Sequence, residues 1–241
     1  MQKILGYIRK AVQDFDLIQK GDRIAVGVSG GKDSLVLLAG LAQIRRFAEF
    51  DYDITAVTID PGFNGVPNNY DAVARLCEKL DVPFSLVHTQ IGEIVFDIRK
   101  EPNPCSLCAN MRRGALHDAA KAAGCNKLAL GHNNDDVIET FIMNLFNEGR
   151  IGCFSPKTHL DRKDITVIRP LVLAPESQVL SACNRNGFEI VKSVCPADKT
   201  TSRQKTKEFL RDIEHKDKGF KLRMFTALRK SGVDGWGYPD K

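Results

Sequence analysis

Residues 26–34 combine glycines, a lysine and hydroxyl side chains at a spacing suited to phosphate binding. The segment reads V-G-V-S-G-G-K-D-S, follows an apolar strand pattern and opens a helix pattern. Glycines let successive N–H groups point into one concave turn, and the following helix adds its positive dipole end. The lysine adds a cation at the same place. We therefore predict a triphosphate cradle made of Val28, Ser29, Gly30, Gly31, Lys32, Asp33 and Ser34.

This loop differs from two commoner nucleotide-binding loops. A Walker loop has four residues between its glycines and a hydroxyl residue after its lysine, whereas here three residues separate the glycines and an aspartate follows Lys32. The G-x-G-x-x-G pattern of dinucleotide-binding folds is also absent from the loop. The segment S-G-G-K-D-S resembles the loop of the PP-loop ATP pyrophosphatases. That resemblance implies cleavage of ATP between its α and β phosphates and attachment of AMP to a carbonyl oxygen.

Seven cysteines are the next candidates for chemistry, and two of them form a C-x-x-C pair, Cys105 and Cys108. Helical periodicity follows over 109–123, so both thiols should lie near a first helical turn, where free N–H groups favour a thiolate. The pair alone is compatible with zinc, an iron–sulfur cluster, a redox dithiol or chance. Because the other cysteines are single, three ligands are the natural count. Cys195, on a predicted loop after the strand-like run 188–191, is the best third ligand.

Two carboxylates and an arginine are further candidates. Asp135 and Asp136 follow the fourth strand-like run, where a carboxylate can hold Mg²⁺ or accept a proton; an N-terminal cap of the next helix is the structural alternative. Arg112 lies one helical turn after Cys108, so its guanidinium can reach an anion beside the cysteines.

The elements that must position these residues follow from alternating strand-like runs and helical periodicity. This alternation predicts an α/β fold with an open, mostly parallel sheet of about five strands and helices on both faces. Ligands collect at the carboxyl ends of such strands near a switch point. The phosphate loop, Ile59 and Gly131 each stand at a strand end, so they should rim one cleft, with Ile59 against adenine and Gly131 permitting close approach of the nucleotide. The runs are 23–29, 54–60, 84–89, 127–132 and 166–171.

Charge is concentrated near the C-terminus. We predict an N-terminal helix over 1–20, an ATP-binding α/β domain over 21–175 and a basic helical extension over 176–241 that carries Cys195. From 199 to 230 the chain has 11 lysines or arginines against 4 acidic residues. A charge run is often only a solvated helix face, but here interleaved phenylalanines favour a surface that follows a nucleic-acid backbone.

Composition bounds the compartment. The 241 residues are 43% hydrophobic, yet no apolar run approaches the ~18 residues of a membrane span. The first 15 residues read as an amphipathic helix, and cysteines without an export signal indicate a reducing compartment. We predict a cytoplasmic protein with no membrane partner. A homodimer is compatible with the sequence, which does not decide the oligomeric state.

Taken together, the motifs resemble the tRNA 2-thiolation branch of the PP-loop family, especially the TtcA-type cytidine 2-sulfurtransferases. The resemblance covers roughly 21–215 and rests on the C-x-x-C pair followed by R-R-G at 112–114, and on L-G-H-N-N-D-D at 130–136 followed by E-T at 139–140. It implies ATP, Mg²⁺ and a [4Fe-4S] cluster held by Cys105, Cys108 and Cys195. It also implies tRNA as substrate and a sulfur donor such as a cysteine desulfurase or inorganic sulfide.

The resemblance further implies a mechanism. AMP would turn the C2 oxygen of a pyrimidine, foremost an anticodon-loop cytidine, into a leaving group, and sulfur on the iron without a protein ligand would replace it. Lys32 would neutralise the β and γ phosphates and Asp33 would help to place Mg²⁺. Arg112 would lie between the cluster and the α phosphate. The implied catalytic set is Asp135, Asp136, Lys32 and Arg112.

Three alternatives stay open from the sequence. The segment G-H-N at 131–133 also resembles the branch that thiolates a tRNA uridine by the same chemistry. An ATP-dependent amide or amidine ligase would share the phosphate loop and use the cysteines for structural zinc, without tRNA. A non-enzymatic iron–sulfur sensor would bind nucleic acid through the basic segment and release no pyrophosphate.

Overall fold

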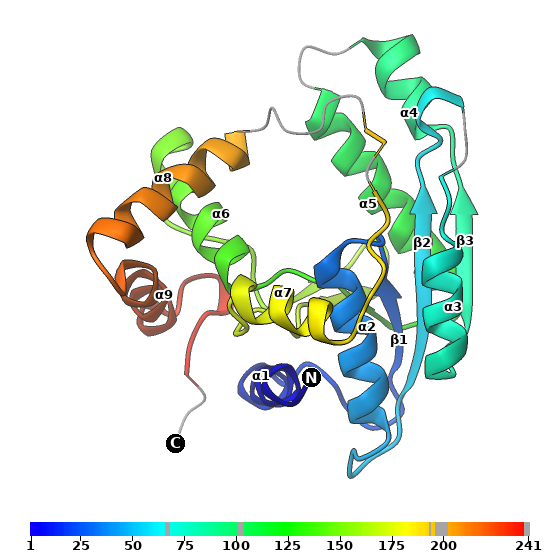
Figure 1. Cartoon of the computed structure of the whole chain (residues 1–241), viewed down its shortest axis with the longest axis horizontal. Helices are drawn as coiled ribbons and strands as arrows, with labels where there is room; N and C mark the ends of the chain where they lie inside the picture. Colours follow the sequence, from blue (N-terminus) through cyan, green and yellow to red (C-terminus); the bar gives the residue numbers. More distant parts are fainter. Residues whose placement is uncertain (66–67, 101–103, 193, 196–201, 239–241) are drawn as a thin grey trace.

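The computed structural model describes residues 1–65, 68–100, 104–192, 194–195 and 202–238. Figure 1 shows the sheet and α5 on one side of the view and α6, α8 and α9 on the other. No helix within these ranges is long and apolar enough to cross a membrane. The helices are α1 (Gln2–Phe15), α2 (Lys32–Arg45), α3 (Asp71–Leu80), α4 (Ile91–Glu93), α5 (Pro104–Ala122), α6 (Asn134–Asn147), α7 (Glu176–Arg185), α8 (Ser202–Lys216) and α9 (Phe220–Ser231), with 3-10 turns η1 (Phe63–Gly65) and η3 (Val233–Gly235) and a π-helical segment η2 (Ile94–Arg99).

In the described residues the sheet has six strands in the order β3-β2-β1-β4-β6-β5. Neighbouring strands are parallel except β5, which runs antiparallel to β6. The chain reverses direction across the sheet beside β1, because β2 lies on one side of that strand and β4 on the other. Such a switch point opens a crevice at the carboxyl ends of the strands. The strands are β1 (Arg23–Gly27), β2 (Asp53–Asp60), β3 (Phe84–His88), β4 (Lys127–Ala129), β5 (Lys157–Leu160) and β6 (Ile165–Ile168).

The predicted mostly parallel sheet is confirmed, but the predicted count of about five strands is low by one. The additional strand is β5, whose sequence K-T-H-L has no apolar run. Polar residues fit there because β5 is an edge strand that stays partly exposed. The expected strands over 127–132 and 166–171 end earlier, at Ala129 and Ile168. Residues 188–191, which read as strand-like, lie outside the sheet.

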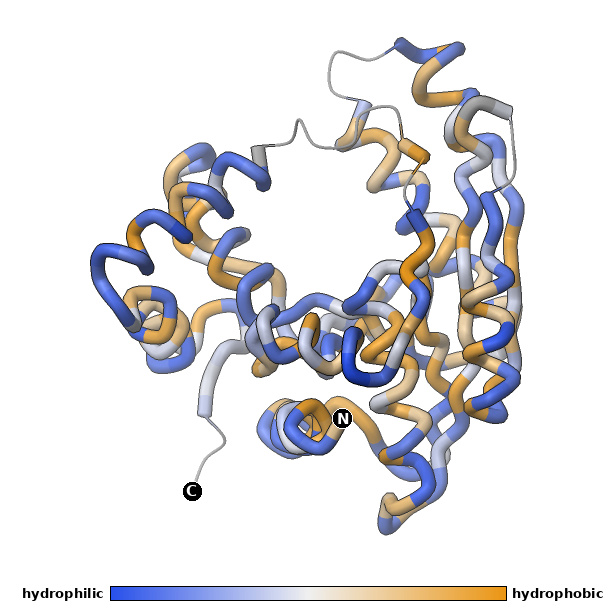
Figure 2. Tube along the Cα trace, in the orientation of Figure 1, coloured by the Kyte–Doolittle hydropathy of each residue, from blue (hydrophilic) through white to orange (hydrophobic). Residues whose placement is uncertain are grey.

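Two apolar layers cover the two faces of the sheet. α2 is buried from Ser34 to Ala42, as expected of a helix that is apolar almost all round. It packs with α1, α3 and α7 over one face. α5 covers the opposite face together with η2. Figure 2 shows the hydrophobic residues concentrated along the strands and α2, and hydrophilic residues along the outer turns of α8 and α9.

The C-terminal segment returns to the core after the two basic helices. Trp236 is fully buried and packs edge to face on Phe15 of α1 and Phe225 of α9, with ring centroids 5.6 Å away in both pairs. Its indole Nε1 donates a hydrogen bond of 3.0 Å to the carbonyl of Phe154. The residues after α9 therefore share one apolar core with the N-terminal helix and the sheet.

Candidate active site

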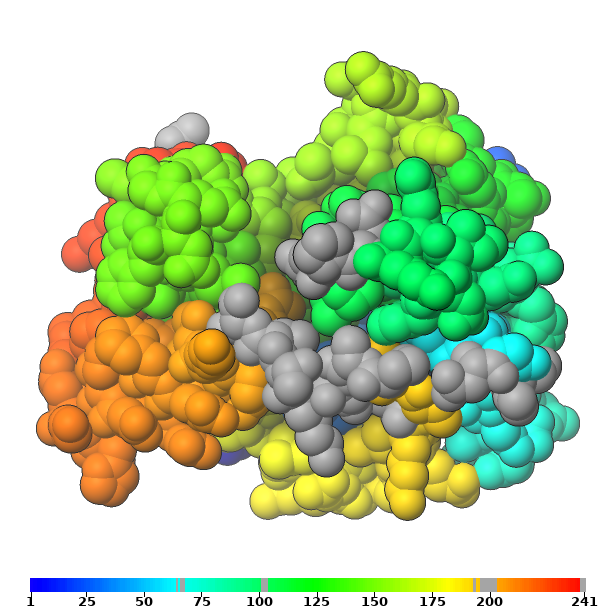
Figure 3. Space-filling model, turned by 90° about the horizontal axis from the view of Figure 1, so that it is seen from above, coloured from blue at the N-terminus to red at the C-terminus, as the bar shows by residue number. Residues whose placement is uncertain are grey.

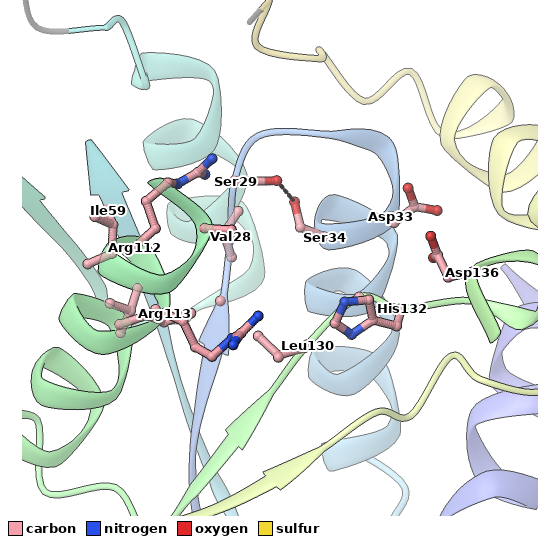
Figure 4. Close-up of a pocket in the computed structure, with 15 residues that line it drawn as sticks. Val28, Ser29, Asp33, Ser34, Ile59, Arg112, Arg113, Leu130, His132 and Asp136 are labelled. Atoms are coloured by element: carbon pink, nitrogen blue, oxygen red, sulfur yellow. Dashed lines mark hydrogen bonds between the residues drawn. The ribbon is translucent and has the colours of Figure 1, made fainter. Parts of the chain in front are cut away.

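The phosphate loop joins β1 to α2 and is fixed by its own backbone. Both the N–H and the carbonyl of Val28 are hydrogen-bonded to β2. Gly31 caps α2 without a side-chain hydrogen bond, so in the described residues the first turn of α2 keeps N–H groups suited to an anion. The Ser34 hydroxyl donates to the Gly31 carbonyl over 2.9 Å, and the hydroxyls of Ser29 and Ser34 lie 3.4 Å apart (Figure 4).

Two carboxylates hold the ammonium group of Lys32. Its Nζ lies 2.8 Å from Asp33 Oδ2 and 3.0 Å from Glu176 Oε1. Burial lowers the pKa of Lys32, but the hydrogen bonds and charges of Asp33 and Glu176 outweigh burial and raise this pKa above its ordinary value. The other carboxylate oxygen of Asp33 accepts a hydrogen bond of 3.0 Å from Asn133. Lys32 is therefore a cation fixed beside the loop.

A pocket of about 410 Å³ lies at the switch point. Its walls come from the ends of β1, β2 and β4, from the first turn of α6 and from α5, as Figure 4 shows. Seen from above, a hollow separates the surfaces of α5 and α6 (Figure 3). The predicted strand ends thus rim one cleft. Predicted site residues that line the pocket are Val28, Ser29, Asp33, Ser34, Ile59, Arg112, Gly131 and Asp136.

Two smaller pockets contain other predicted residues. One of about 230 Å³ is lined by Ser29, Gly31 and Arg112 together with Val191 and Val194. Another of about 260 Å³ lies on the far side of the loop and is lined by ten polar or charged residues: Lys32, Asp33, Asn133, Asp135, Asp136, Glu139, Glu176, Arg203, Gln204 and Lys207. Lys32 and Asp135 are therefore brought together in this third pocket rather than in the first.

The three predicted cysteine ligands lie on the α5 side of the main pocket. Cys108 is buried one turn before Arg112, Cys105 is exposed, and Cys195 packs against the apolar cluster that contains Cys108. Burial raises the pKa of the Cys108 thiol, the Arg112 charge lowers it, and the thiolates of Cys195 and Cys105 raise it. Each of the other two thiols thus acts electrostatically on Cys108.

The chemistry of these three predicted ligands is compatible with an iron–sulfur cluster. Among the described residues, no group of three His, Cys, Asp or Glu side chains can hold one metal ion. A cluster spans several iron atoms and takes soft thiolate ligands, so its three cysteines need not converge on one point. Cys105, Cys108 and Cys195 would supply such thiolates on losing their protons, and the raised pKa of Cys108 means that binding of the cluster would have to release its proton.

The two predicted carboxylates point to different places. Asp136 forms a capping box with Asn133: each accepts a backbone N–H of the other, at 2.9 and 3.3 Å. Burial raises the pKa of Asp136, which faces the main pocket. Asp135 Oδ2 accepts the N–H of Glu176 over 2.7 Å, and its Oδ1 lies 2.8 Å from Lys221 Nζ. Asp136 thus fulfils the capping alternative, whereas Asp135 ties α6 to α7 and α9.

His132 adds a neutral ring to the pocket. It is tilted against the Phe154 ring, with centroids 4.8 Å apart. Burial lowers the pKa of His132 to about 3, and the charges of three arginines add to this effect. Its Nδ1 has no hydrogen-bond partner in the described part of the chain. The imidazole is therefore uncharged at neutral pH.

Glu139 provides a pH-dependent stability prediction. Burial raises the pKa of this carboxyl to about 7, and the Asp136 charge adds to the effect. The folded chain then holds a proton that the unfolded chain has lost, so the stability due to this group is present below pH 4.5 and is lost as pH rises through 7. We expect Glu139→Gln to be more stable than the wild type by about 1–3 kcal/mol at pH 8, with little difference near pH 4.5.

Urea unfolding at both pH values would measure this difference. Glu148→Gln is the matched control, since Glu148 lies at the end of the same helix with its side chain 60% exposed. Equal stability of the Glu139→Gln variant and the wild type at pH 8 would show that the buried carboxylate is compensated by Arg203.

A segment after α7 crosses the phosphate loop. The Val191 N–H donates to the Gly30 carbonyl over 3.0 Å. Gly30 has φ +81°, and a Cβ on it would lie 2.6 Å from both Cβ and Cγ2 of Val191. Glycine is thus required by its conformation and by this close contact. In the sequence this segment precedes Cys195, the predicted third ligand.

Gly30→Ala tests the contact with Val191. The left-handed conformation alone costs about 1–2 kcal/mol in an alanine, and the clash must also displace Val191. We expect lower thermal stability and weaker ATP binding, measured by thermal unfolding and calorimetry. Gly21→Ala is the matched control, because Gly21 has φ +83° with no atom within 4 Å of a Cβ. If both variants behave alike, the Val191 contact contributes nothing.

Glycine at position 131 is required for a structural reason besides the predicted approach of the nucleotide. A Cβ there would meet the backbone of the phosphate loop, with the Asp33 carbonyl carbon and the Ser34 nitrogen both at 3.1 Å. Glycine therefore lets the β4–α6 connection pack on the start of α2. Its predicted part in admitting the nucleotide stays a prediction.

Sequence reasoning gave no role to Asn133, Arg113 or Glu176. Asn133 was detectable, because an asparagine followed three residues later by an acid is the pattern of a capping box. Arg113 lines the pocket next to Arg112 and was visible only as part of a motif. Glu176 follows Pro175 as an ordinary acidic residue of a first helical turn, so no local signal marks its contact with Lys32.

Comparisons with known proteins identify a family whose members bind nucleotides with such a loop. The PP-loop domain family matches residues 3–212. The tRNA-cytidine(32) 2-sulfurtransferase of Pelobacter propionicus is 41% identical over 224 residues, which are 92% of this chain and 82% of that protein. The protein of the same name from Geobacter sulfurreducens is 38% identical over 230 residues, 94% of this chain and 89% of that protein.

A solved structure of a tRNA thiolase also matches this chain. The U34-tRNA thiolase NcsA from Methanococcus maripaludis, with its [4Fe-4S] cluster, matches with a TM-score of 0.76 and 27% identity, over 93% of this chain and 76% of that one. The phosphate loop at the switch point, the family match and these relatives lead to one conclusion. The chain belongs to the PP-loop family, in its TtcA-like branch of tRNA 2-thiolation proteins.

Proposed function

We propose that this protein is an ATP-dependent tRNA sulfurtransferase that converts a cytidine of the anticodon loop to 2-thiocytidine. The observation that carries the proposal is the 410 Å³ pocket, which joins the phosphate loop to Arg112 and Arg113 of α5, the helix that bears Cys105 and Cys108. ATP and a thiolate-bound group can therefore meet in one cleft. The relatives named tRNA-cytidine(32) 2-sulfurtransferase support cytidine as the target.

The residues of the chain have separate tasks in this proposal. The first turn of α2, Ser29 and Ser34 would bind the pyrophosphate part of ATP, and Lys32 would neutralise its charge. Ile59 would pack on adenine. Arg112 would lie against the α phosphate and stabilise the negative charge that develops as the pyrimidine oxygen attacks. Asp33 and Asp136, which face the pocket, would place Mg²⁺.

Cys105, Cys108 and Cys195 would hold a [4Fe-4S] cluster. That group would supply the sulfur that replaces the activated C2 oxygen, and AMP would leave with that oxygen. The sulfur would come from a cysteine desulfurase or from inorganic sulfide. The pKa of His132, lowered to about 3 by burial, makes its imidazole a weak base, so Asp135 and Asp136 remain the candidates for proton transfer.

α8 and α9 would contact the tRNA backbone. Arg203 and Arg211 of α8 and Arg223 of α9 have side chains 45%, 74% and 56% exposed. Each lies beside a carboxylate, of Asp136, Asp212 and Asp217 respectively, which a tRNA phosphate would have to replace. Such contacts give affinity without reading the sequence. The choice of base then depends on the pocket.

Nucleoside analysis tests the proposal. tRNA from a strain that lacks the gene should lose 2-thiocytidine and regain it when the wild-type gene is restored. Loss of a 2-thiouridine instead would favour the second candidate, uridine thiolation, which the U34-tRNA thiolase structure supports. Unchanged tRNA would overturn both.

Metal analysis separates the remaining alternatives. Protein purified without oxygen should contain close to four iron atoms and four acid-labile sulfides per chain. Stoichiometric zinc without iron would favour the ligase with structural zinc. A cluster whose removal changes nucleic-acid affinity, without pyrophosphate release, would favour the sensor.

A further inference from the structure

Two lysines of the basic helices α8 and α9 form ion pairs with carboxylates beside the phosphate loop. Lys207 of α8 lies 2.7 Å from Glu176 Oε1, and Lys221 of α9 lies 2.8 Å from Asp135 Oδ1. The two carboxylates are themselves joined, because Asp135 accepts the backbone N–H of Glu176. The helices proposed to bind tRNA are thus connected by ion pairs to the site proposed to bind ATP.

Glu176 is the centre of this network. The same oxygen, Oε1, receives Lys207 at 2.7 Å and Lys32 at 3.0 Å. Burial raises the pKa of Glu176, but the hydrogen bonds from the two lysines outweigh it and hold the pKa below its ordinary value. Its place on the first turn of α7, which packs against α2 (Figure 1), fixes it between the two cations.

We infer that Glu176 is a positioning residue that makes nucleotide binding at the phosphate loop and tRNA binding at α8 antagonistic. A carboxylate shared by two ammonium groups holds either one more tightly when the other is withdrawn. A triphosphate draws Lys32 away, so Glu176 retains Lys207 more strongly and makes it less available to tRNA. The coupling is reciprocal. When tRNA draws Lys207 away, Glu176 holds Lys32 more tightly, so Lys32 binds the triphosphate less strongly. This inference rests on the proposed function.

The antagonism has a use in the proposed reaction. The triphosphate and the tRNA must both be bound for adenylation, and pyrophosphate must then leave while the adenylated tRNA stays bound. Glu176 weakens the hold of Lys32 on phosphate when tRNA occupies α8, which favours departure of pyrophosphate at that stage.

Binding measurements test the inference. The probes are α,β-methylene ATP, which cannot be cleaved between the α and β phosphates, and an unmodified tRNA transcript, with the full-length chain purified without oxygen. For the wild type we expect saturating tRNA to raise the Kd of the nucleotide about fivefold, at the low end of typical coupling because the side chains of both pairs are partly exposed. In Glu176→Gln the ratio should fall below about twofold, because the shared charge is gone.

Lys207→Met should lose the antagonism to the same extent as Glu176→Gln. Lys205→Met is the matched control: it removes the same charge from an exposed position of α8 and should weaken tRNA binding while keeping the fivefold ratio. If Glu176 had only a structural role, Glu176→Gln would weaken the binding of both ligands and leave unchanged the ratio of the nucleotide Kd with tRNA to that without tRNA. Direct repulsion between the two polyanions would also persist in Glu176→Gln.

The outcomes separate this inference from the proposed function. Antagonism in Glu176→Gln equal to that of the wild type overturns the inference. A wild-type nucleotide Kd that tRNA does not change overturns it as well, while thiolation of the transcript would keep the function standing. Failure of the wild type to bind tRNA at all overturns both.

Discussion

Cys195→Ala is expected to abolish tRNA thiolation while leaving ATP binding unchanged. Cys195 does not line the 410 Å³ pocket, and its only proposed task is to supply one of three thiolates. Two remaining thiolates cannot hold a cluster that has one iron already without a protein ligand. The measurements are 2-thiocytidine formed in a tRNA transcript, iron per chain, and the Kd of α,β-methylene ATP.

The matched control is Cys125→Ala. Cys125 is buried in the same apolar cluster as Cys108, but it lies just before β4 and is not one of the predicted ligands. It should keep its iron and its activity, apart from a modest loss of stability. Wild-type thiolation by the Cys195→Ala variant would remove Cys195 from the site. Equal losses of iron and thiolation in the two variants would mean that each cysteine contributes only to the stability of the fold.

The fold was predictable where the sequence pattern has a strong physical cause. The central parallel strands are buried on both faces, so most positions of β1 and β2 are buried and can be recognised from the sequence alone. β5 was missed because an edge strand is held by pairing with β6 rather than by its own apolar side chains. Phe188 and Val191 of the run 188–191 are apolar for another reason: both pack against the main core cluster, and Val191 also contacts Gly30 of the phosphate loop.

The candidate site was predictable where function requires a special backbone or a special atom. A glycine at positive φ, Gly30, and paired thiols are such requirements, and they mark the phosphate loop and the C-x-x-C pair. Glu176 and Lys207 are different, because any acid on a first helical turn and any lysine on a basic helix would look the same. The ion pairs that Glu176 forms with Lys32 and with Lys207 depend on how α7 and α8 pack, which no local pattern records.

The same limit explains the reading of the two aspartates. D-D after a strand indicates carboxylates at the rim of a cleft, but only Asp136 lines the main pocket, whereas Asp135 lines the smaller pocket beside Lys32. Their directions differ, because Asp136 is turned by its capping box with Asn133 toward the main pocket. Asp135 is instead engaged by Lys221 and the α7 backbone. A role for Asp135 in proton transfer would require Lys221 to release it.

Trp236→Ala is expected to destabilise the protein by about 3–5 kcal/mol, the range typical for removing a large buried aromatic side chain. The indole is fully buried and contacts Phe15 and Phe225. Its removal leaves a cavity between α1 and α9 and an unpaired carbonyl at Phe154. Urea unfolding of the full chain would measure the loss.

Trp236→Phe and Phe47→Ala are the controls for this change. The phenylalanine keeps most of the apolar contact but loses the hydrogen bond to Phe154, so a smaller loss of about 1–2 kcal/mol is expected. Phe47 is 76% exposed, and its replacement by alanine should leave the free energy of unfolding nearly unchanged. Because Trp236 holds α9 against the core, its loss should also loosen Lys221 from Asp135 and weaken tRNA binding. A Trp236→Ala variant as stable as the wild type would show that the basic helices are anchored by α6 alone, and tRNA affinity would then survive the substitution.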